Sequence, residues 1–117
     1  MQYILVYTTL PKRRKARSIL KTLLKERLVA CGNIIKIDSG YWWEGEVVED
    51  REYVLILKTR KELYEKLEKK ILELHPYEVP MIVAWEIDKG FEGYLRWVDK
   101  ETQNEGREIH GEGKGGD

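Results

Sequence analysis

Apolar residues recur along this chain with two periods, and the periods separate helices from strands. Side chains repeating at three- and four-residue spacing form the apolar stripe of an amphipathic helix. Short runs rich in β-branched and aromatic residues are typical of strands. The predicted segments are strands over 3–9, 31–43, 46–58 and 81–87, helices over 12–28 and 63–74, and a short helix over 91–98.

Turn-forming and capping residues mark the ends of these segments. Glu44-Gly45 is predicted as the tight turn of a hairpin between the two middle strands. Thr59 and Glu62 have the spacing of a capping box, in which the Thr oxygen accepts from a backbone N–H and Glu62 reaches back. Pro76 ends the second helix because proline cannot continue one.

The order of the segments predicts an α+β fold, a ferredoxin-like βαββαβ sandwich with a long central hairpin and a short C-terminal helix. Right-handed crossovers then place both main helices on one face of the sheet. The other face should be polar, but the runs YILVY, YVLIL and MIVAW are apolar on both sides. The third helix is too short to cover this second face. We therefore expect copies of the same chain to cover it and to close into a small ring.

The length of the hairpin leads to the same expectation. Residues 46–58 span about 43 Å at roughly 3.3 Å per residue, whereas the helix over 12–28 spans only about 25 Å at roughly 1.5 Å per residue. A bulge near 49–50 would shorten the hairpin, but not by half. Its tip, YWWEG, therefore extends past the helices, and adjacent tryptophans on a strand point to opposite faces. The predicted contacts between subunits are Tyr41, Trp42, Trp43 and Tyr53.

Composition narrows the class of protein. Lys plus Arg (21) balances Asp plus Glu (21), so no overall field favours nucleic acid or an anionic membrane. The single cysteine, Cys31, excludes an internal disulfide and suits a reducing cytosol. The N-terminal segment lacks the pattern of a signal peptide, and no apolar run is long enough to cross a bilayer. Abundant Lys, Arg and Glu are typical of thermostable proteins. We expect a cytoplasmic protein.

The chain divides into a folded domain over 1–101 and a tail over 102–117. The tail, TQNEGREIHGEGKGGD, is rich in glycine and has one aliphatic residue, so it cannot bury enough apolar surface to order itself. We interpret it as a flexible Gly-rich segment. Its deletion is expected to leave melting and assembly nearly unchanged.

Basic residues cluster at the start of the first helix, beginning with KRRK at 12–15. An anion at a helix N-terminus would be stabilised there, but a solvated helix face is the more economical interpretation. A third hypothesis is that the acidic hairpin segment EGEVVEDRE meets this helix across a subunit boundary. RNA-recognition modules share the topology, yet the strand EYVLILKT lacks their glycines and has a single aromatic, Tyr53.

Residues capable of catalysis are few. His75 precedes a proline at a predicted helix end, where an imidazole commonly caps carbonyls. Cys31 lies in an apolar strand, where a thiol is usually inert. The carboxylates of the hairpin, Glu44 to Glu52, alternate like those of an exposed strand rather than as an acid–base pair. The sequence therefore predicts that the protein is not an enzyme.

Several short motifs resemble those of the CutA divalent-cation tolerance family, in the same order and spacing. They are VYTT at 6–9, ERLVACGNI at 26–34, YWWEG at 41–45, LKTR at 57–60, ELHPYEVP at 73–80 and YLRWV at 94–98. The resemblance implies an interlocked homotrimer in the cytoplasm that takes part in the metal-ion response, with copper bound in some members. It also implies an architecture like that of the PII signalling proteins, which keeps a small-ligand sensor or assembly scaffold open as an alternative.

The resemblance and the residue chemistry together give two sets of candidate site residues. His75 and Cys31 are the candidate metal ligands, and the hypothesis is a shallow, low-affinity copper site centred on His75 with Cys31 structural. Lys58, Arg60 and Tyr77 are the candidates for a ligand cleft between subunits, where an anion is expected. The family often has Glu after the second proline of HPYEVP, whereas this chain has Met81. No cofactor is required by either hypothesis.

Overall fold

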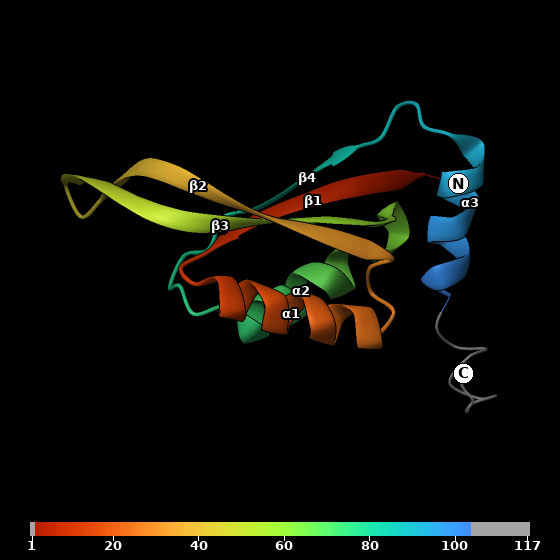
Figure 1. The fold of residues 1–117 in the computed structure, drawn as a ribbon, viewed down its shortest axis with the longest axis horizontal. Helices are drawn as coiled ribbons and strands as arrows, with labels where there is room; N and C mark the ends of the chain where they lie inside the picture. Colours follow the sequence, from red (N-terminus) through yellow and green to blue (C-terminus); the bar gives the residue numbers. More distant parts are fainter. Residues whose placement is uncertain (1, 104–117) are drawn as a thin grey trace.

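The computed structural model describes residues 2–103, which form one four-stranded sheet with helices (Figure 1). The elements are β1 (Tyr3–Leu10), α1 (Arg13–Lys25), β2 (Cys31–Trp43), β3 (Glu46–Arg60), the 3-10 turn η1 (Lys61–Leu63), α2 (Tyr64–Leu74), β4 (Ile82–Glu86) and α3 (Glu92–Glu101). The strand order is β2-β3-β1-β4, and all neighbours are antiparallel. This confirms the predicted α+β, ferredoxin-like fold. No helix within residues 2–103 has the length and apolarity needed to cross a membrane.

Helices α1 and α2 lie side by side against the same face of the sheet, as predicted (Figure 1). The core fills the space between these helices and the inward-facing residues of the strands. Its fully buried members include Val6, Leu55, Leu57, Leu23 and Ile71. Gly32 permits the close approach of α1 to β2, because a Cβ there would lie 2.6 Å from Leu20 Cδ1.

The hairpin of β2 and β3 is unbroken from Cys31, opposite Lys58, to Trp43, opposite Glu46. The register contains no bulge, so nothing shortens the hairpin. Glu44 and Gly45 both have positive φ (51° and 83°), as a two-residue type I′ turn requires. The described chain is 51 Å long in its longest dimension, and the hairpin tip extends beyond both helices (Figure 1).

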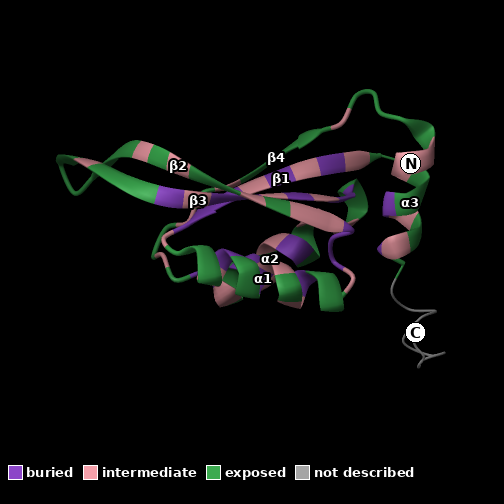
Figure 2. Ribbon diagram, viewed as in Figure 1, coloured by how far each residue is buried: buried purple, intermediate pink, exposed green. Residues whose placement is uncertain are grey.

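The face of the sheet opposite α1 and α2 is apolar and largely uncovered within residues 2–103. We call it the open face. Ile35, Val83 and Trp85 are 48%, 39% and 48% exposed on it, and exposed residues continue along the hairpin to its tip (Figure 2). This confirms the prediction that the strands are apolar on both sides.

Helix α3 stands at the end of the sheet opposite the hairpin tip (Figure 1). Arg60, at the end of β3, donates from Nε to Thr102 Oγ1 and from Nη2 to Thr102 O, both at 2.9 Å. Arg27 pairs with Glu101 at 2.7 Å. Thr102 is fully buried, so the folded part includes this residue, which composition assigned to the tail. Gln103 is also described, and the other tail residues, 104–117, lie outside the described part of the chain.

The capping box predicted at Thr59 and Glu62 is wrong. Strand β3 continues to Arg60, and η1 begins at Lys61 without a side-chain cap. The Thr59 hydroxyl is buried and donates to Leu28 O at 2.7 Å. The Thr59 hydroxyl therefore bonds to a distant carbonyl, on the connection between α1 and β2, and not to the start of a helix as the local sequence predicts.

Helix α1 ends three residues earlier than predicted. Leu28 N–H donates to Leu23 O and Arg27 N–H donates to Leu24 O, the hydrogen bonds of a Schellman motif. Arg27 has φ of 61°, a left-handed conformation that glycine usually takes at this position. The ion pair of Arg27 with Glu101 links this helix end to the last residue of α3.

Candidate functional site

A hollow of about 650 Å³ opens on the open face beside the hairpin. We call it the hairpin hollow. The side chains that give it its chemistry are Tyr7, Tyr41, Trp43, Glu52, Tyr77 and Met81. They come from β1, from both strands of the hairpin, and from the segment between α2 and β4. The hollow therefore forms only when these separate segments come together in the fold.

Glu52 is the buried charge of the hairpin hollow. It is 5% exposed and lies opposite Ile37 in the hairpin. The Tyr77 hydroxyl donates to Glu52 Oε2 at 2.7 Å. Burial, followed by this hydrogen bond to the carboxylate, raises the pKa of Tyr77, so the phenol stays protonated and keeps donating. No ion pair joins Glu52 to a cationic side chain within residues 2–103.

His75 holds Tyr77 in position. Tyr77 N–H donates to His75 Nδ1 at 3.2 Å, so Nδ1 is the acceptor and the proton resides on Nε2. Nε2–H in turn donates to Thr9 O at 2.8 Å. The rings of His75 and Tyr77 lie 5.0 Å apart. Both imidazole nitrogens are therefore engaged within the chain, and burial is the main cause that lowers the pKa of His75.

Cys31 lies far from His75. Its Sγ is 3.1 Å from the Tyr94 hydroxyl of α3, and burial, followed by this contact, raises the pKa of Tyr94. Cys31 is aligned through Lys58 with Leu5, whereas His75 contacts Thr9. These positions on β1 are separated by about 13 Å at roughly 3.3 Å per residue. The structure therefore does not bring the two candidate metal ligands together.

Metal-ligand chemistry is sparse in the described part of the chain. No group of three or more His, Cys, Asp or Glu residues within residues 2–103 has the geometry to hold a metal ion. His75 has given both nitrogens to protein partners, and Cys31 contacts a phenol rather than a second soft ligand. The residues of a single chain between 2 and 103 therefore do not fit a tight copper site.

Two of the three cleft candidates are used elsewhere. Lys58 Nζ donates to Asn33 Oδ1, and Arg60 is 8% exposed with its guanidinium bonded to Thr102. Neither lines the hairpin hollow, whereas Tyr77 does. The expected anion site around Lys58 and Arg60 is therefore not formed within one chain.

Sequence reasoning missed Glu52, which it placed among the exposed carboxylates of the hairpin. The period of the strand contains a signal for its burial. Glu52 is in phase with Val54 and Ile56, which lie on the same face of β3. A carboxylate in phase with an apolar face is a buried charge unless the strand bends.

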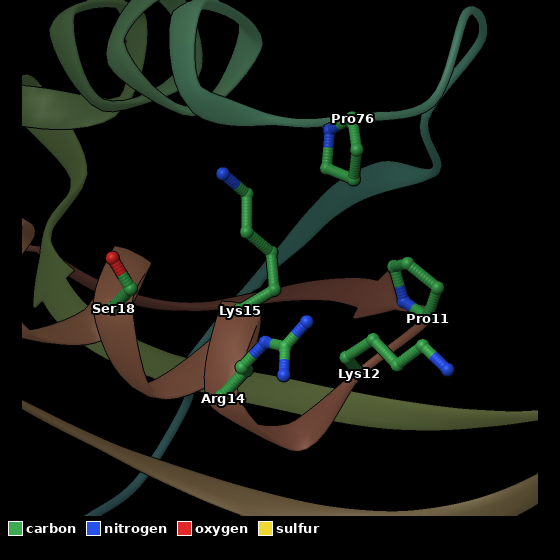
Figure 3. Close-up of a pocket in the computed structure, with 6 residues that line it drawn as sticks. All are labelled: Pro11, Lys12, Arg14, Lys15, Ser18 and Pro76. Atoms are coloured by element: carbon green, nitrogen blue, oxygen red, sulfur yellow. The ribbon is translucent and has the colours of Figure 1, made fainter.

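A second, smaller hollow of about 400 Å³ lies at the start of α1 and is lined by Pro11, Lys12, Arg14, Lys15, Ser18 and Pro76. Figure 3 shows that the charged ends of the three basic side chains point in different directions. The first turn of α1 has no acidic residue and no side-chain cap. Cations that diverge are typical of a solvated helix face and do not converge on one anion.

Fold and hollow together define a ferredoxin-like α+β protein whose open face carries a carboxylate hollow beside an extended hairpin. The family model described as "CutA1 divalent ion tolerance protein" matches residues 4–101. This chain belongs to that family, which confirms the resemblance drawn from its motifs.

Curated relatives named as divalent-cation tolerance proteins match most of the chain. The "Divalent-cation tolerance protein CutA" of Pyrococcus horikoshii is 50% identical over 100 residues, covering 86% of this chain and 98% of the relative. The protein of the same name from Thermus thermophilus is 46% identical, covering 83% and 95%.

Solved structures share the fold. A crystal structure of a single-site variant of CutA1 from Pyrococcus horikoshii has a TM-score of 0.84 at 50% identity, covering 86% of this chain and 99% of that one. CutA1 from Oryza sativa has a TM-score of 0.86 at 37% identity, covering 90% and 97%. A third structure, from Archaeoglobus fulgidus, is named a periplasmic divalent cation tolerance protein, with a TM-score of 0.85 at 35% identity, covering 86% and 99%.

Proposed function

We propose that the chain acts as a homotrimer in the cytoplasmic response to divalent metal ions, and that its working site is the hairpin hollow. The open face is the observation that carries this proposal. Trp85 and Ile35 are each 48% exposed on this face. Exposed apolar surface of this kind marks a contact with a partner, and a closed ring of identical chains buries it without leaving an edge.

We propose that copper binds weakly, at a shallow site, and that the protein needs no resident metal. Cys31 is structural in this proposal, consistent with its contact to Tyr94. A metal at His75 would have to displace the hydrogen bond that Nε2–H donates to Thr9 O or the one that Nδ1 accepts from Tyr77 N–H, which limits its affinity. Within residues 2–103, the thiol of Cys31 and the imidazole of His75, both of which copper prefers, lie apart.

The alternative function is that of a small-ligand sensor or assembly scaffold, and the hairpin hollow is the observation that favours it. The hollow combines an apolar wall with a buried carboxylate and a fixed hydroxyl, as ligand sites commonly do. In this alternative the metal-ion response follows from ligand binding at the hollow rather than from metal held by the chain.

Sedimentation equilibrium at micromolar concentration tests the assembly, for which we expect a trimer with no stable folded monomer. A compact, folded monomer at that concentration would contradict it. Copper titration by calorimetry on a chain lacking 104–117 tests the metal proposal without interference from His110. Weak binding that disappears in His75→Ala supports the shallow site. Sub-micromolar binding that survives His75→Ala would overturn it, and no binding by either protein favours the alternative.

A further inference from the structure

Among residues 2–103, the hairpin hollow is lined by acidic and uncharged side chains. Glu52 and Glu78 line it, and none of the residues that line it within 2–103 is Lys, Arg or His. Glu52 is 5% exposed and its carboxylate is stabilised by the neutral Tyr77 hydroxyl. A buried carboxylate without a counter-charge is costly. A cationic partner that enters the hollow would offset this cost.

The walls of the hollow also suit a cation. Tyr41 and Trp43 lie on the same face of β2, and Tyr77 faces them from the segment after α2. Aromatic faces attract ammonium and guanidinium groups, more strongly when the cation is desolvated. Val79 and Met81 continue the apolar lining, so an apolar stem attached to the cation would be buried with it.

The lining favours a cationic nitrogen over a metal ion or an anion. A hard divalent ion takes six or more oxygen ligands, whereas the carboxylates of the hollow are Glu52 and Glu78. An anion would meet two carboxylates and no cation. Ammonium and guanidinium, in contrast, need one carboxylate, a hydroxyl and aromatic walls, all of which lie in the hollow.

We propose that the hairpin hollow binds a cationic nitrogen group on a short apolar stem, an alkylammonium or an alkylguanidinium, with Glu52 as its counter-ion. The inference deepens the sensor alternative and rests on the hollow being the working site. The group belongs either to a free small molecule or to a Lys or Arg side chain of a neighbouring copy. The chemistry is the same in both cases, and the experiment distinguishes the sources.

The test uses the full chain and three probes of similar size: n-butylammonium, neutral butyramide and anionic butyrate. If the site is open to free ligand, calorimetry should show n-butylammonium binding about tenfold tighter or more than either control. Glu52→Gln keeps the shape of the side chain and should remove this preference. Glu46→Gln is the matched control, because Glu46 is an exposed carboxylate of the same strand and does not line the hollow.

If a neighbouring copy supplies the cation, n-butylammonium should show no preference, and Glu52→Gln should instead weaken assembly by about tenfold or more relative to Glu46→Gln. Sedimentation equilibrium measures that change. The proposal is overturned if neither probe preference nor assembly depends on the charge at 52. Glu52→Met provides a second uncharged variant if Glu52→Gln does not fold, and the comparison of probes on the unaltered chain needs no variant.

The same samples separate this inference from the proposed trimer. If the protein is a monomer that prefers n-butylammonium, the cation site is supported and the proposed trimer is contradicted. If it is a trimer in which Glu52 affects neither binding nor assembly, the trimer is supported and the cation site is contradicted.

Discussion

The two faces of the sheet are made from the same strands, and both are apolar, yet they meet different surroundings. On the inner face, Val6 and Leu57 are fully buried under α1 and α2. On the open face, Val83 is 39% and Trp85 48% exposed. The apolar area is similar in kind, so the difference lies in what covers it. The inner face is covered by helices of its own chain, and we propose that a partner or ligand covers the open face.

Helix α3 qualifies this contrast at one end of the sheet. Tyr94 of α3 contacts Cys31, and Thr102, directly after the helix, accepts a hydrogen bond from Arg60. The helix therefore covers the part of the open face farthest from the hairpin tip (Figure 1). The rest of that face, including the hairpin hollow, has no such cover within residues 2–103. The proposed working surface is therefore the portion of the sheet that residues 2–103 leave open.

The largest expected effect compares adjacent residues on the two faces. Leu57→Ala should lower the free energy of unfolding by about 2–5 kcal/mol, because it leaves a cavity in a fully buried core. Ile56→Ala, one position earlier on the open face, should act mainly on assembly. Denaturant unfolding combined with sedimentation measures both. Equal effects of the two variants on both quantities would contradict the contrast.

The hairpin tip tests the open face directly. Trp43→Ala should weaken the assembly by about 2–4 kcal/mol, because large aromatics at the centre of an interface commonly carry its binding energy. Trp43 lines the hollow and is 42% exposed in the single chain. Sedimentation equilibrium over a dilution series measures the loss. An unchanged association constant would show that the hollow lies outside the interface.

Much of this architecture could be predicted from the sequence, because hydrophobic period and turn chemistry are local properties. The run from Tyr41 to Gly45 identifies the hairpin tip, and Glu44-Gly45 adopts the positive φ values that its turn requires. The order of strands then follows from handed connections. The sequence also predicts that both faces of the sheet are apolar. It does not predict what covers the open face, because that depends on another molecule.

The errors arose where a distant residue decides the role of a side chain. Thr59 has the local pattern of a helix cap, but Leu28 O accepts its hydroxyl. Arg60 was predicted as a ligand for an anion, but its guanidinium donates to Thr102, which is distant in the sequence. His75 was identified as a site residue, yet its positioning of Tyr77 depends on a carbonyl of β1. Such pairings exist only once the fold has formed.

The attachment of α3 to the open face gives the next prediction. Arg60→Met should lower the free energy of unfolding by about 1–3 kcal/mol, because it leaves buried hydrogen-bond partners of the guanidinium at Thr102 unsatisfied. Amide exchange should rise first in α3. Arg51→Met is the control, since its pair with Asp38 is 3.8 Å apart and well exposed. Unchanged amide exchange in α3 would contradict the prediction that the hydrogen bonds of Arg60 to Thr102 hold α3 against the sheet.

The free energy of unfolding should depend on pH through His75, the residue that positions Tyr77 in the hairpin hollow. Burial is the main cause that holds the folded-state pKa of His75 below 6.5, against opposing contributions from Thr9 and Glu52. The unfolded state therefore binds more protons, and stability falls as pH drops from about 6.5 through the folded-state pKa. One such group contributes at most about 1.4 kcal/mol per pH unit.

Unfolding free energies measured between pH 7.5 and pH 5.5, with His75→Gln as the comparison, test this sign. The slope should be steeper in the unaltered protein, because Gln does not titrate. Identical slopes in the two proteins would indicate that His75 has the same pKa folded and unfolded.

The smallest effect is expected at Trp42, the neighbour of Trp43 on the opposite face of the hairpin. Trp42 is 73% exposed and lies on the side of α1 and α2, but the hairpin extends past both helices (Figure 1). Trp42 also lies at the edge of the hairpin hollow. Trp42→Ala should therefore change the free energy of unfolding by less than about 0.5 kcal/mol and weaken the association less than Trp43→Ala does. If Trp42→Ala dissociates the assembly as strongly as Trp43→Ala, a partner covers both faces of the tip. The distinction between a self-covered and a partner-covered face would then hold for the body of the sheet but end where the hairpin leaves the helices.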